Sequence, residues 1–282
     1  MNIKTQKFGE IDILKIDNHF CEAAISFQGA QVLSYQLKTQ KGISEKLWLS
    51  DLNKYESKKA IRGGIPLCFP WFGSSPINKN YPSHGFARNI LWELKEVIHN
   101  EDGHHLRFEL VDNAQTREIW PFKFCLVQTI HLGQKLTIDF ELENKDEGQF
   151  EYSFAWHSYF ATDIFSTKIE GLKNVEYIDQ LRNNEYYKQE VTDIFVQEEV
   201  DRIYPKTSGN FKITSTANSP IFIKTNAESA VIWNPWIEKS KRLNDMRDDG
   251  WKEFICLECG QIAQPISLAP KEKNTFTLEV NV

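Results

Sequence analysis

Short segments in which apolar and polar residues alternate are the feature that most limits how this chain can fold. The clearest is Lys135–Glu143, where every second residue is a large apolar one and the others are Lys, Thr, Asp or Glu. A period of two indicates a strand with one buried and one solvated face. Turn signals such as Asp102-Gly103 separate the segments. The same alternation marks Leu106–Leu110, Phe276–Val280 and Asn210–Thr214, and weaker candidates are Ile11–Ile16, Ile25–Phe27, Val32–Leu37, Phe124–Ile130 and Ile221–Thr225.

Helical segments are few. Asn113–Trp120 predicts one or two helical turns before Pro121, and Glu238–Asp249 predicts a short surface helix closed by Gly250. No internal repeat and no low-complexity linker divides the 282 residues. Many evenly spaced strands with few helices are typical of an all-β sandwich or barrel. We therefore expect one domain over residues 1–282, a large antiparallel β-sandwich with few short helices.

The segment Ile61–Arg88 interrupts this pattern. Gly63 and Gly64 permit backbone angles that are closed to other residues, and two prolines exclude a regular helix or a central strand. Arg62 and Arg88 stand near the two ends. A planar guanidinium group binds a carboxylate or phosphate through two parallel bonds, so the pair suits a fixed anion. The alternative is that both arginines pair with some of the 39 acidic residues and brace the loop, and this segment alone does not decide between the two.

Composition limits the class of protein. The net charge is −6, whereas a nucleic-acid binder is expected to carry a basic surface, so any anion site is a local feature. The first residues lack the apolar core of a signal peptide. No uncharged apolar run approaches the roughly 18 residues that a membrane span needs. We therefore expect a cytoplasmic protein whose partner is neither nucleic acid nor a membrane.

The cysteines and paired histidines do not predict a metal or redox site. Five cysteines are too few, and odd in number, for a disulfide framework. Cys256 and Cys259 lie in what looks like a buried strand, where positions three apart point to opposite faces, and no second C-x-x-C pair completes a zinc site. His104 and His105 follow a polar turn and lack further ligands. We expect the cysteines in the core, the two histidines in solvent, and no metal.

Two titratable residues lie in segments predicted to be strands. If Phe150–Phe160 is a strand, its aromatic residues form a core face, and His157 lies on the opposite, smaller and more polar face. In Phe254–Gly260 every residue except Glu258 is apolar or small. A carboxylate kept from water has a raised pKa, which suits proton abstraction near neutral pH. A structural, hydrogen-bonded histidine and a buried Glu258–arginine ion pair are the alternatives, and the residues alone leave them open.

Two further segments are less informative. Trp233-Asn234-Pro235-Trp236 brings two aromatic rings to a turn, where they either stack on the C–H faces of a sugar or fill the core. Asp201 either accepts hydrogen bonds from the hydroxyls of a ligand or serves as a turn residue.

Together these segments resemble the hexose-6-phosphate mutarotases, the glucose-6-phosphate 1-epimerases of the aldose 1-epimerase superfamily. The resemblance runs in order from Arg62 to Gly260 and so covers nearly the whole chain. Its most specific part is His84–Arg88 with Arg62-Gly63-Gly64 upstream. The matching segments are Arg62–Pro66, Phe69–Gly73, His84–Arg88, Trp156–Phe160, Trp233–Trp236 and Leu257–Gly260.

The resemblance implies a galactose-mutarotase-like β-sandwich that exchanges the α and β anomers of a hexose-6-phosphate, with glucose-6-phosphate favoured. It also implies that Glu258 is the general base and His157 the general acid. Glu258 would take the proton of the anomeric hydroxyl while His157 gives one to the ring oxygen, and after rotation about the C1–C2 bond the same groups close the ring. We expect a monomer that acts on a small-molecule sugar phosphate and needs no cofactor.

The substrate contacts follow from the same resemblance. Arg62 and Arg88 match arginines on the phosphate side, and Asp201 matches a carboxylate that holds sugar hydroxyls. His84 matches a second histidine that faces the substrate. The residue before it is often a glutamine in the family and is Ser83 here, so the resemblance leaves the preferred sugar phosphate open.

Other functions make different demands on these residues. A carbohydrate-binding sandwich without catalysis has no need of a buried Glu258 opposite His157. A mutarotase for unphosphorylated aldoses has no need of the two arginines. A glycoside hydrolase needs two carboxylates, for which Glu258 and Asp201 are available. A cupin-type metal isomerase needs a closely spaced His-x-His and Glu set, which the sequence lacks.

Overall fold

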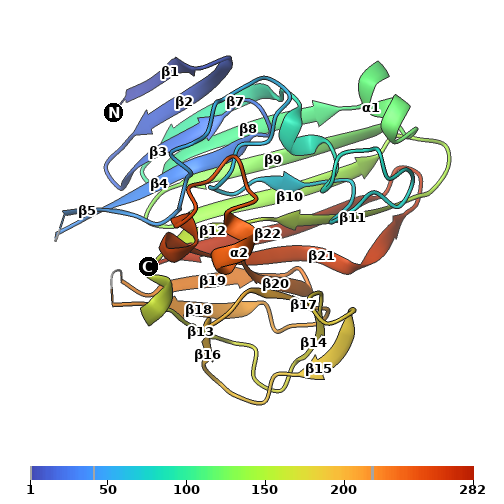
Figure 1. Ribbon diagram of the computed structural model, residues 1–282. Helices are drawn as coiled ribbons and strands as arrows, with labels where there is room; N and C mark the ends of the chain where they lie inside the picture. The colour runs from blue at the N-terminus through green and yellow to red at the C-terminus, as the bar shows by residue number, and fades with distance from the viewer. Residues whose placement is uncertain (1, 41, 217–218) are drawn as a thin grey trace.

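Antiparallel strands make up most of the chain. The computed structural model describes residues 2–40, 42–216 and 219–282, and in these residues the named strands form sheets of five, nine and eight strands. Figure 1 shows the two larger sheets layered on each other, with the five-stranded sheet at the upper left. Only short helices accompany them. The expected all-β sandwich is confirmed.

The five-stranded sheet is a meander in which each strand pairs with the next. Its strands are β1 (Asn2–Phe8), β2 (Ile11–Asp17), β3 (Cys21–Ser26), β4 (Gln31–Thr39) and β5 (Gly42–Glu45).

The nine-stranded sheet is assembled from distant parts of the chain. In spatial order its strands are β16 (Ile194–Phe195), β13 (Lys168–Glu170), β18 (Asn210–Thr214), β19 (Ile221–Thr225), β22 (Lys273–Asn281), β10 (Leu136–Asn144), β9 (Phe124–Leu132), β8 (Gly103–Val111) and β7 (Glu93–Asn100).

The eight-stranded sheet carries the candidate site. Its main path runs through β15 (Glu185–Lys188), β14 (Glu176–Asp179), β17 (Val200–Tyr204), β20 (Ser229–Asn234), β21 (Phe254–Leu268), β11 (Phe150–Trp156) and β6 (Leu67–Cys68), and β12 (Tyr159–Ala161) pairs with β21. The helices are α1 (Ala114–Ile119), α2 (Trp236–Ser240) and three short 3-10 helices, Ala87–Asn89, Ile164–Ser166 and Gly250–Glu253.

The alternation read from the sequence is the alternation of burial in the sheets. In β10 the residues are buried and half-buried in turn, and Ile138 lies between its register partners Ile130 of β9 and Leu278 of β22. Each fully buried side chain of this kind contributes roughly 1.5–3 kcal/mol by leaving water. All the strand segments named from the sequence overlap observed strands.

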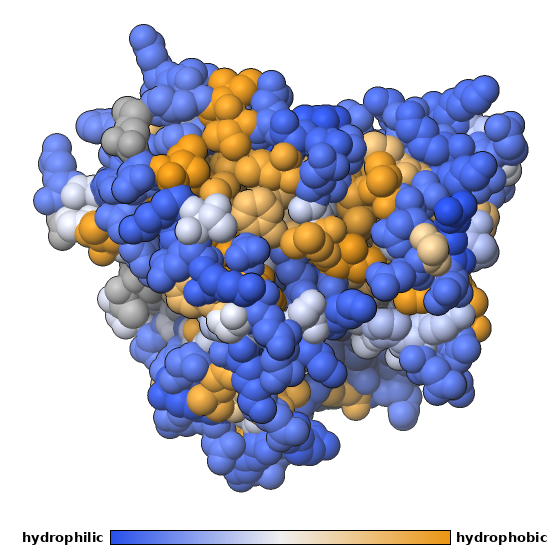
Figure 2. Space-filling model, turned by 90° about the horizontal axis from the view of Figure 1, so that it is seen from above, coloured by the Kyte–Doolittle hydropathy of each residue, from blue (hydrophilic) through white to orange (hydrophobic). Residues whose placement is uncertain are grey.

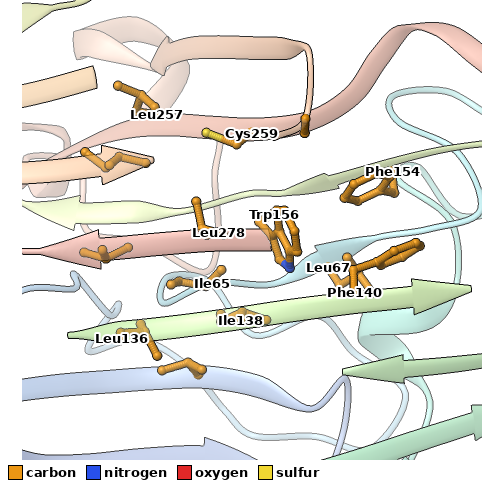
Figure 3. Close-up of a cluster of buried hydrophobic side chains, with 14 of the residues drawn as sticks. Ile65, Leu67, Leu136, Ile138, Phe140, Phe154, Trp156, Leu257, Cys259 and Leu278 are labelled. Carbon is orange, nitrogen blue, oxygen red and sulfur yellow. The ribbon is translucent and has the colours of Figure 1, made fainter. Parts of the chain in front are cut away.

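One hydrophobic core fills the space between the two larger sheets. Figure 3 shows Ile138 and Phe140 of β10 gathered with Phe154 and Trp156 of β11 and with Leu257 of β21. A second, smaller cluster covers the other face of the eight-stranded sheet. Strands β11, β20 and the first half of β21 are therefore buried on both faces. Cys256 lies in the smaller cluster and Cys259 in the larger one, as expected for a buried strand.

Two expectations about local structure were wrong. His104 is not in solvent: it is 2% exposed, on β8, with its Nδ1 3.0 Å from Asn18 Nδ2. Strand parity explains this, because His104 shares its face with Leu106 and Phe108, which are also buried. His105, on the opposite face, is half-buried and stacks on His131 with ring centroids 4.0 Å apart.

The second error concerns the helix expected over Glu238–Asp249. The observed helix is α2, which begins at Trp236 and ends at Ser240, and Gly250 opens a 3-10 helix instead of closing an α-helix. The backbone N–H of Trp236 donates to Asn234 Oδ1, which starts the helix earlier than the polar pattern indicates. Asn113–Trp120 forms α1 as expected, with Asn113 as its N-cap.

Figure 2 shows a largely hydrophilic face with apolar areas across its middle. In the part of the chain that is described, no helix has the length and apolar character needed to cross a bilayer.

Asn234 offers a test of how the site is held in the sheet. Its side chain is fully buried, its Nδ2 donates to the carbonyls of Trp251 and Phe254, and its Oδ1 accepts from Trp236 N–H. Asn234→Ala leaves these groups without partners, so we expect the free energy of unfolding to fall by roughly 3 kcal/mol in denaturant titrations. The exposed Asn210→Ala is the control, with an expected change under about 0.5 kcal/mol. Equal stability of the two variants would contradict this role for Asn234.

Candidate active site

The candidate site lies on the face of the eight-stranded sheet that is turned away from the main core. Across this face Asp201 pairs in register with Trp233, Trp233 with Cys256, and Cys256 with Tyr159. Glu258 lies two residues beyond Cys256 on β21 and so points the same way. Parity along four neighbouring strands therefore brings these side chains together.

His157 lies where one strand breaks into two. The segment Phe150–Phe160 is not a single strand: β11 ends at Trp156 and β12 begins at Tyr159. The backbone N–H of His157 leaves the sheet and donates to Pro66 O at 2.9 Å. The faces are still those expected, since Trp156 and Phe160 lie in the main core and Tyr159 in the second cluster.

His157 and Glu258 contact each other in a dry environment. His157 Nε2 lies 3.4 Å from Glu258 Oε1, and the two residues are 7% and 1% exposed. Burial raises the pKa of the Glu258 carboxyl well above its usual value, and the nearby charge of Asp201 raises it further. Burial likewise lowers the pKa of the His157 imidazole well below its usual value. Both shifts favour the uncharged form of each group.

Each member of the His157–Glu258 pair has one polar atom without a hydrogen-bond partner among the described residues. His157 Nδ1 and Glu258 Oε2 are buried and have no hydrogen-bond partner among the described residues. Buried polar atoms without partners are rare in folded proteins because each costs free energy. The described chain also places no arginine or lysine within salt-bridge distance of Glu258, whose ionic contact is His157. An ion pair with an arginine is therefore not what holds this carboxylate.

His84 lies beside the pair as a neutral side chain. Its ring meets the His157 ring edge to face, with centroids 5.6 Å apart. Gly73 N–H donates to His84 Nδ1 at 3.2 Å, so the ring proton is on Nε2 and can be donated to a ligand. Burial lowers the pKa of His84 to about 3, with the charges of Arg88 and Arg62 adding to the shift.

The turn at His84 depends on the glycine that follows it. Both residues have a positive φ, 64° at His84 and 70° at Gly85. A Cβ on Gly85 would lie 2.0 Å from the carbonyl oxygen of Phe69, which no side chain tolerates. This close approach explains why the motif has glycine at that position.

The two arginines are held in different ways. Arg62 Nε donates to Asp245 Oδ2 at 3.1 Å, and Nη2 forms an ion pair with the same oxygen at 3.0 Å. Its Nη1 donates to the Tyr159 hydroxyl at 3.1 Å. Pairing with an acidic residue, the alternative left open by the sequence, is therefore what Arg62 does here. Arg88 donates from Nη2 to Ser83 O at 3.0 Å, and its buried Nε has no partner in the described residues. Arg88 is the arginine left available to an anion.

Asp201 has a partner that the sequence did not suggest. Lys239 Nζ lies 3.5 Å from Asp201 Oδ2 and 3.2 Å from Glu199 Oε1, and it lies over the Trp233 ring. Burial raises the pKa of Asp201, and Lys239 lowers it. Asp201 is on strand β17, so it is not a turn residue.

Three residues of this arrangement were missed by the sequence analysis. Asp245 and Lys239 both fall inside the surface helix expected over Glu238–Asp249, so nothing located them near the sheet; in the structure Lys239 is on α2 and Asp245 lies beyond its end. Tyr159 could have been found, because strand parity puts it on the same face as His157. Among the described residues, no group of three or more His, Cys, Asp or Glu side chains is arranged to hold a metal ion.

Comparisons with known proteins place the chain in a family. Residues 12–281 match the family described as aldose 1-epimerase. The chain is 34% identical over 259 residues to a protein of Escherichia coli named "putative glucose-6-phosphate 1-epimerase", covering 91% of this chain and 85% of that protein. A protein of the same name from Cenchrus ciliaris is 32% identical over 265 residues, covering 90% and 79%.

Solved structures agree with the sequence relatives. A crystal structure of a "putative mutarotase" from Salmonella typhimurium superposes with a TM-score of 0.92 at 30% identity, over 99% of this chain and 92% of that one. The galactose 1-epimerase of Lactobacillus acidophilus is 13% identical, and its TM-score of 0.75 over 99% and 98% of the chains reports the galactose-mutarotase-like fold alone. Because the family match spans nearly the whole sequence and these relatives cover most of its length, the chain belongs to the aldose 1-epimerase family.

Proposed function

We propose that this protein interconverts the α and β anomers of a hexose-6-phosphate, with glucose-6-phosphate as the preferred substrate. The observation that carries the proposal is the buried His157–Glu258 pair, in which each member keeps one atom without a partner. The names of the sequence relatives support the substrate class. The match over residues 12–281 supports a single catalytic domain, which we propose acts as a monomer on a small-molecule sugar phosphate.

The reaction needs one proton taken and one proton given at the same moment. In the productive form Glu258 is a carboxylate and His157 an imidazolium, a state that differs from the neutral pair only by transfer of one proton from Glu258 to His157 across their 3.4 Å contact. Glu258 removes the proton of the anomeric hydroxyl, the bond between C1 and the ring oxygen breaks, and His157 protonates that oxygen. The product is the open-chain aldehyde, with Glu258 protonated and His157 neutral.

Ring closure reverses these steps on the other face of the aldehyde. Rotation about the C1–C2 bond turns that face toward the ring-forming hydroxyl. His157 then takes the proton of this hydroxyl as it attacks C1, and Glu258 returns a proton to the new anomeric oxygen. No proton is gained or lost over the cycle. Burial favours the state in which Glu258 and His157 are both uncharged, and this is their state while the sugar is the open-chain aldehyde.

The remaining side chains bind the substrate in this proposal. His84 donates its Nε2 proton to a sugar oxygen, and Asp201 accepts from sugar hydroxyls. A phosphate group carries about −1.5 to −2 charges at neutral pH, which the arginines complement. Arg88 supplies a guanidinium group with no carboxylate partner in the described chain, whereas Arg62 shares its charge with Asp245.

Anomer exchange measured by NMR tests the reaction and its substrate. We expect the protein to accelerate α–β exchange of glucose-6-phosphate much more than that of free glucose, because only the phosphorylated sugar engages the arginines. Activity should survive dialysis against EDTA, because two side chains supply both proton transfers. Loss of activity on chelation, restored by a divalent ion, would contradict the mechanism. Equal rates with both sugars would instead indicate a mutarotase for unphosphorylated aldoses.

Variants of the acid–base pair test the mechanism. We expect His157→Asn and Glu258→Gln each to lower kcat by at least about 10²-fold, because each removes a proton-transfer group while keeping a similar shape. Thermal unfolding should show that both variants remain folded. His131→Asn, on the distant strand β9, is the matched control and should keep full activity. Full activity in either site variant would remove that residue from the mechanism.

Variants of the arginines test the phosphate assignment. We expect Arg88→Ala to raise the KM for glucose-6-phosphate by roughly 10- to 150-fold, the contribution of one charge-assisted hydrogen bond. Arg62→Ala should raise it less, because Asp245 already neutralises part of that charge. The slow reaction of free glucose should stay nearly unchanged in both, and Arg107→Ala on β8 should change neither. If both site variants keep the wild-type preference for the phosphorylated sugar, the arginines are only loop braces.

A further inference from the structure

Tyr159 lies between the His157–Glu258 pair and Arg62. It is 2% exposed, on β12, and its ring stacks on the His157 imidazole with centroids 4.8 Å apart and planes 11° apart. Its hydroxyl oxygen accepts a hydrogen bond from Arg62 Nη1 at 3.1 Å. One side chain thus contacts both a residue of the acid–base pair and an arginine proposed for the phosphate side.

The surroundings of Tyr159 leave its ring little freedom. Trp48 stacks on it with ring centroids 5.9 Å apart, and Trp233 and Phe254 pack against it at 6.2 and 5.3 Å. Its backbone N–H donates to Gly64 O, and its carbonyl accepts from Trp48 N–H. A ring fixed on this many sides fixes in turn the plane of the imidazole that lies against it.

The hydroxyl is suited to orient Arg62. A guanidinium group only donates hydrogen bonds, so the Tyr159 oxygen must be the acceptor. Burial raises the pKa of this hydroxyl above its usual value, so the oxygen stays protonated and uncharged. Arg62 is therefore held from two directions, by the Asp245 carboxylate and by a neutral oxygen that fixes its direction without cancelling its charge.

We propose that Tyr159 is a positioning residue that joins substrate binding to catalysis, with its hydroxyl orienting Arg62 and its ring orienting His157. The inference rests on the proposed function, which assigns His157 to proton transfer and Arg62 to the phosphate group. It adds a residue to which neither the sequence motifs nor the family resemblance assigned a role. Its two contacts have separate consequences: the hydroxyl contact with Arg62 affects substrate affinity, and the ring contact with His157 affects the proton-transfer step.

Tyr159→Phe isolates the hydroxyl, since it keeps the ring and its stacking. We expect the KM for glucose-6-phosphate to rise roughly three- to tenfold, the effect of one lost hydrogen bond, with kcat and the pH profile unchanged. The reaction of free glucose should be unaffected. The dissociation constant of inorganic phosphate, measured by calorimetry, should rise by a similar factor. Tyr35→Phe is the control, because it also removes a fully buried hydroxyl, one that donates to Gly133 O, and it should change none of these values.

Tyr159→Leu tests the ring. We expect kcat to fall at least about tenfold on both sugars, because a displaced imidazole is a poor proton donor, and the phenylalanine variant to restore it. If the leucine variant does not fold, the phenylalanine variant still tests the contact between the hydroxyl and Arg62. An unchanged KM and phosphate affinity in Tyr159→Phe, or an equal loss on both sugars, would overturn the proposal. If the wild-type protein fails to exchange anomers, the proposed function fails, while phosphate binding by Tyr159→Phe still tests the contact with Arg62.

Discussion

The exclusion of water from the Glu258 carboxyl is the constraint on which the rest of the site depends. The residue sits on a strand whose other side is the main core, and its own side is covered by the second cluster. An isolated carboxylate in such a place costs several kcal/mol, so the group is either neutral or paired with a proton source. His157 supplies that partner, and its position depends on the break between β11 and β12. In the proposed mechanism, the same contact therefore serves both folding and acid–base chemistry.

Charge in the site is distributed so that only part of it is cancelled. Arg62 is paired with Asp245, Asp201 with Lys239, and Glu258 with His157. Arg88 stands apart, since in the described chain it has no carboxylate partner. An acidic protein thus presents one guanidinium group with unused hydrogen-bonding capacity next to two neutral histidines, which is an arrangement suited to an anionic sugar.

Strand parity was sufficient to predict the fold class and the faces on which His157 and Glu258 lie, because both depend on local alternation. The same rule, applied to His104, would have predicted its burial, but the neighbouring turn signal was given more weight. The partner of Arg62 could not be predicted from the sequence, because Arg62 and Asp245 are 183 positions apart and meet only through tertiary structure. The start of α2 was missed because it depends on an Asn234 hydrogen bond rather than on an apolar pattern.

The place of β22 in the nine-stranded sheet has a consequence for how the chain is made. This strand pairs with β10 on one side and β19 on the other, and Lys135 of the segment leading into β10 meets Glu279 at a separation of 144 positions. While the ribosome is still synthesising the residues between them, one edge of β10 has no partner and exposes its hydrogen-bonding groups. The sandwich consequently closes late, and contacts of such long range make folding slow relative to that of helical proteins. An unfinished chain of this protein therefore exposes an unpaired strand edge, which is the kind of surface on which aggregation starts.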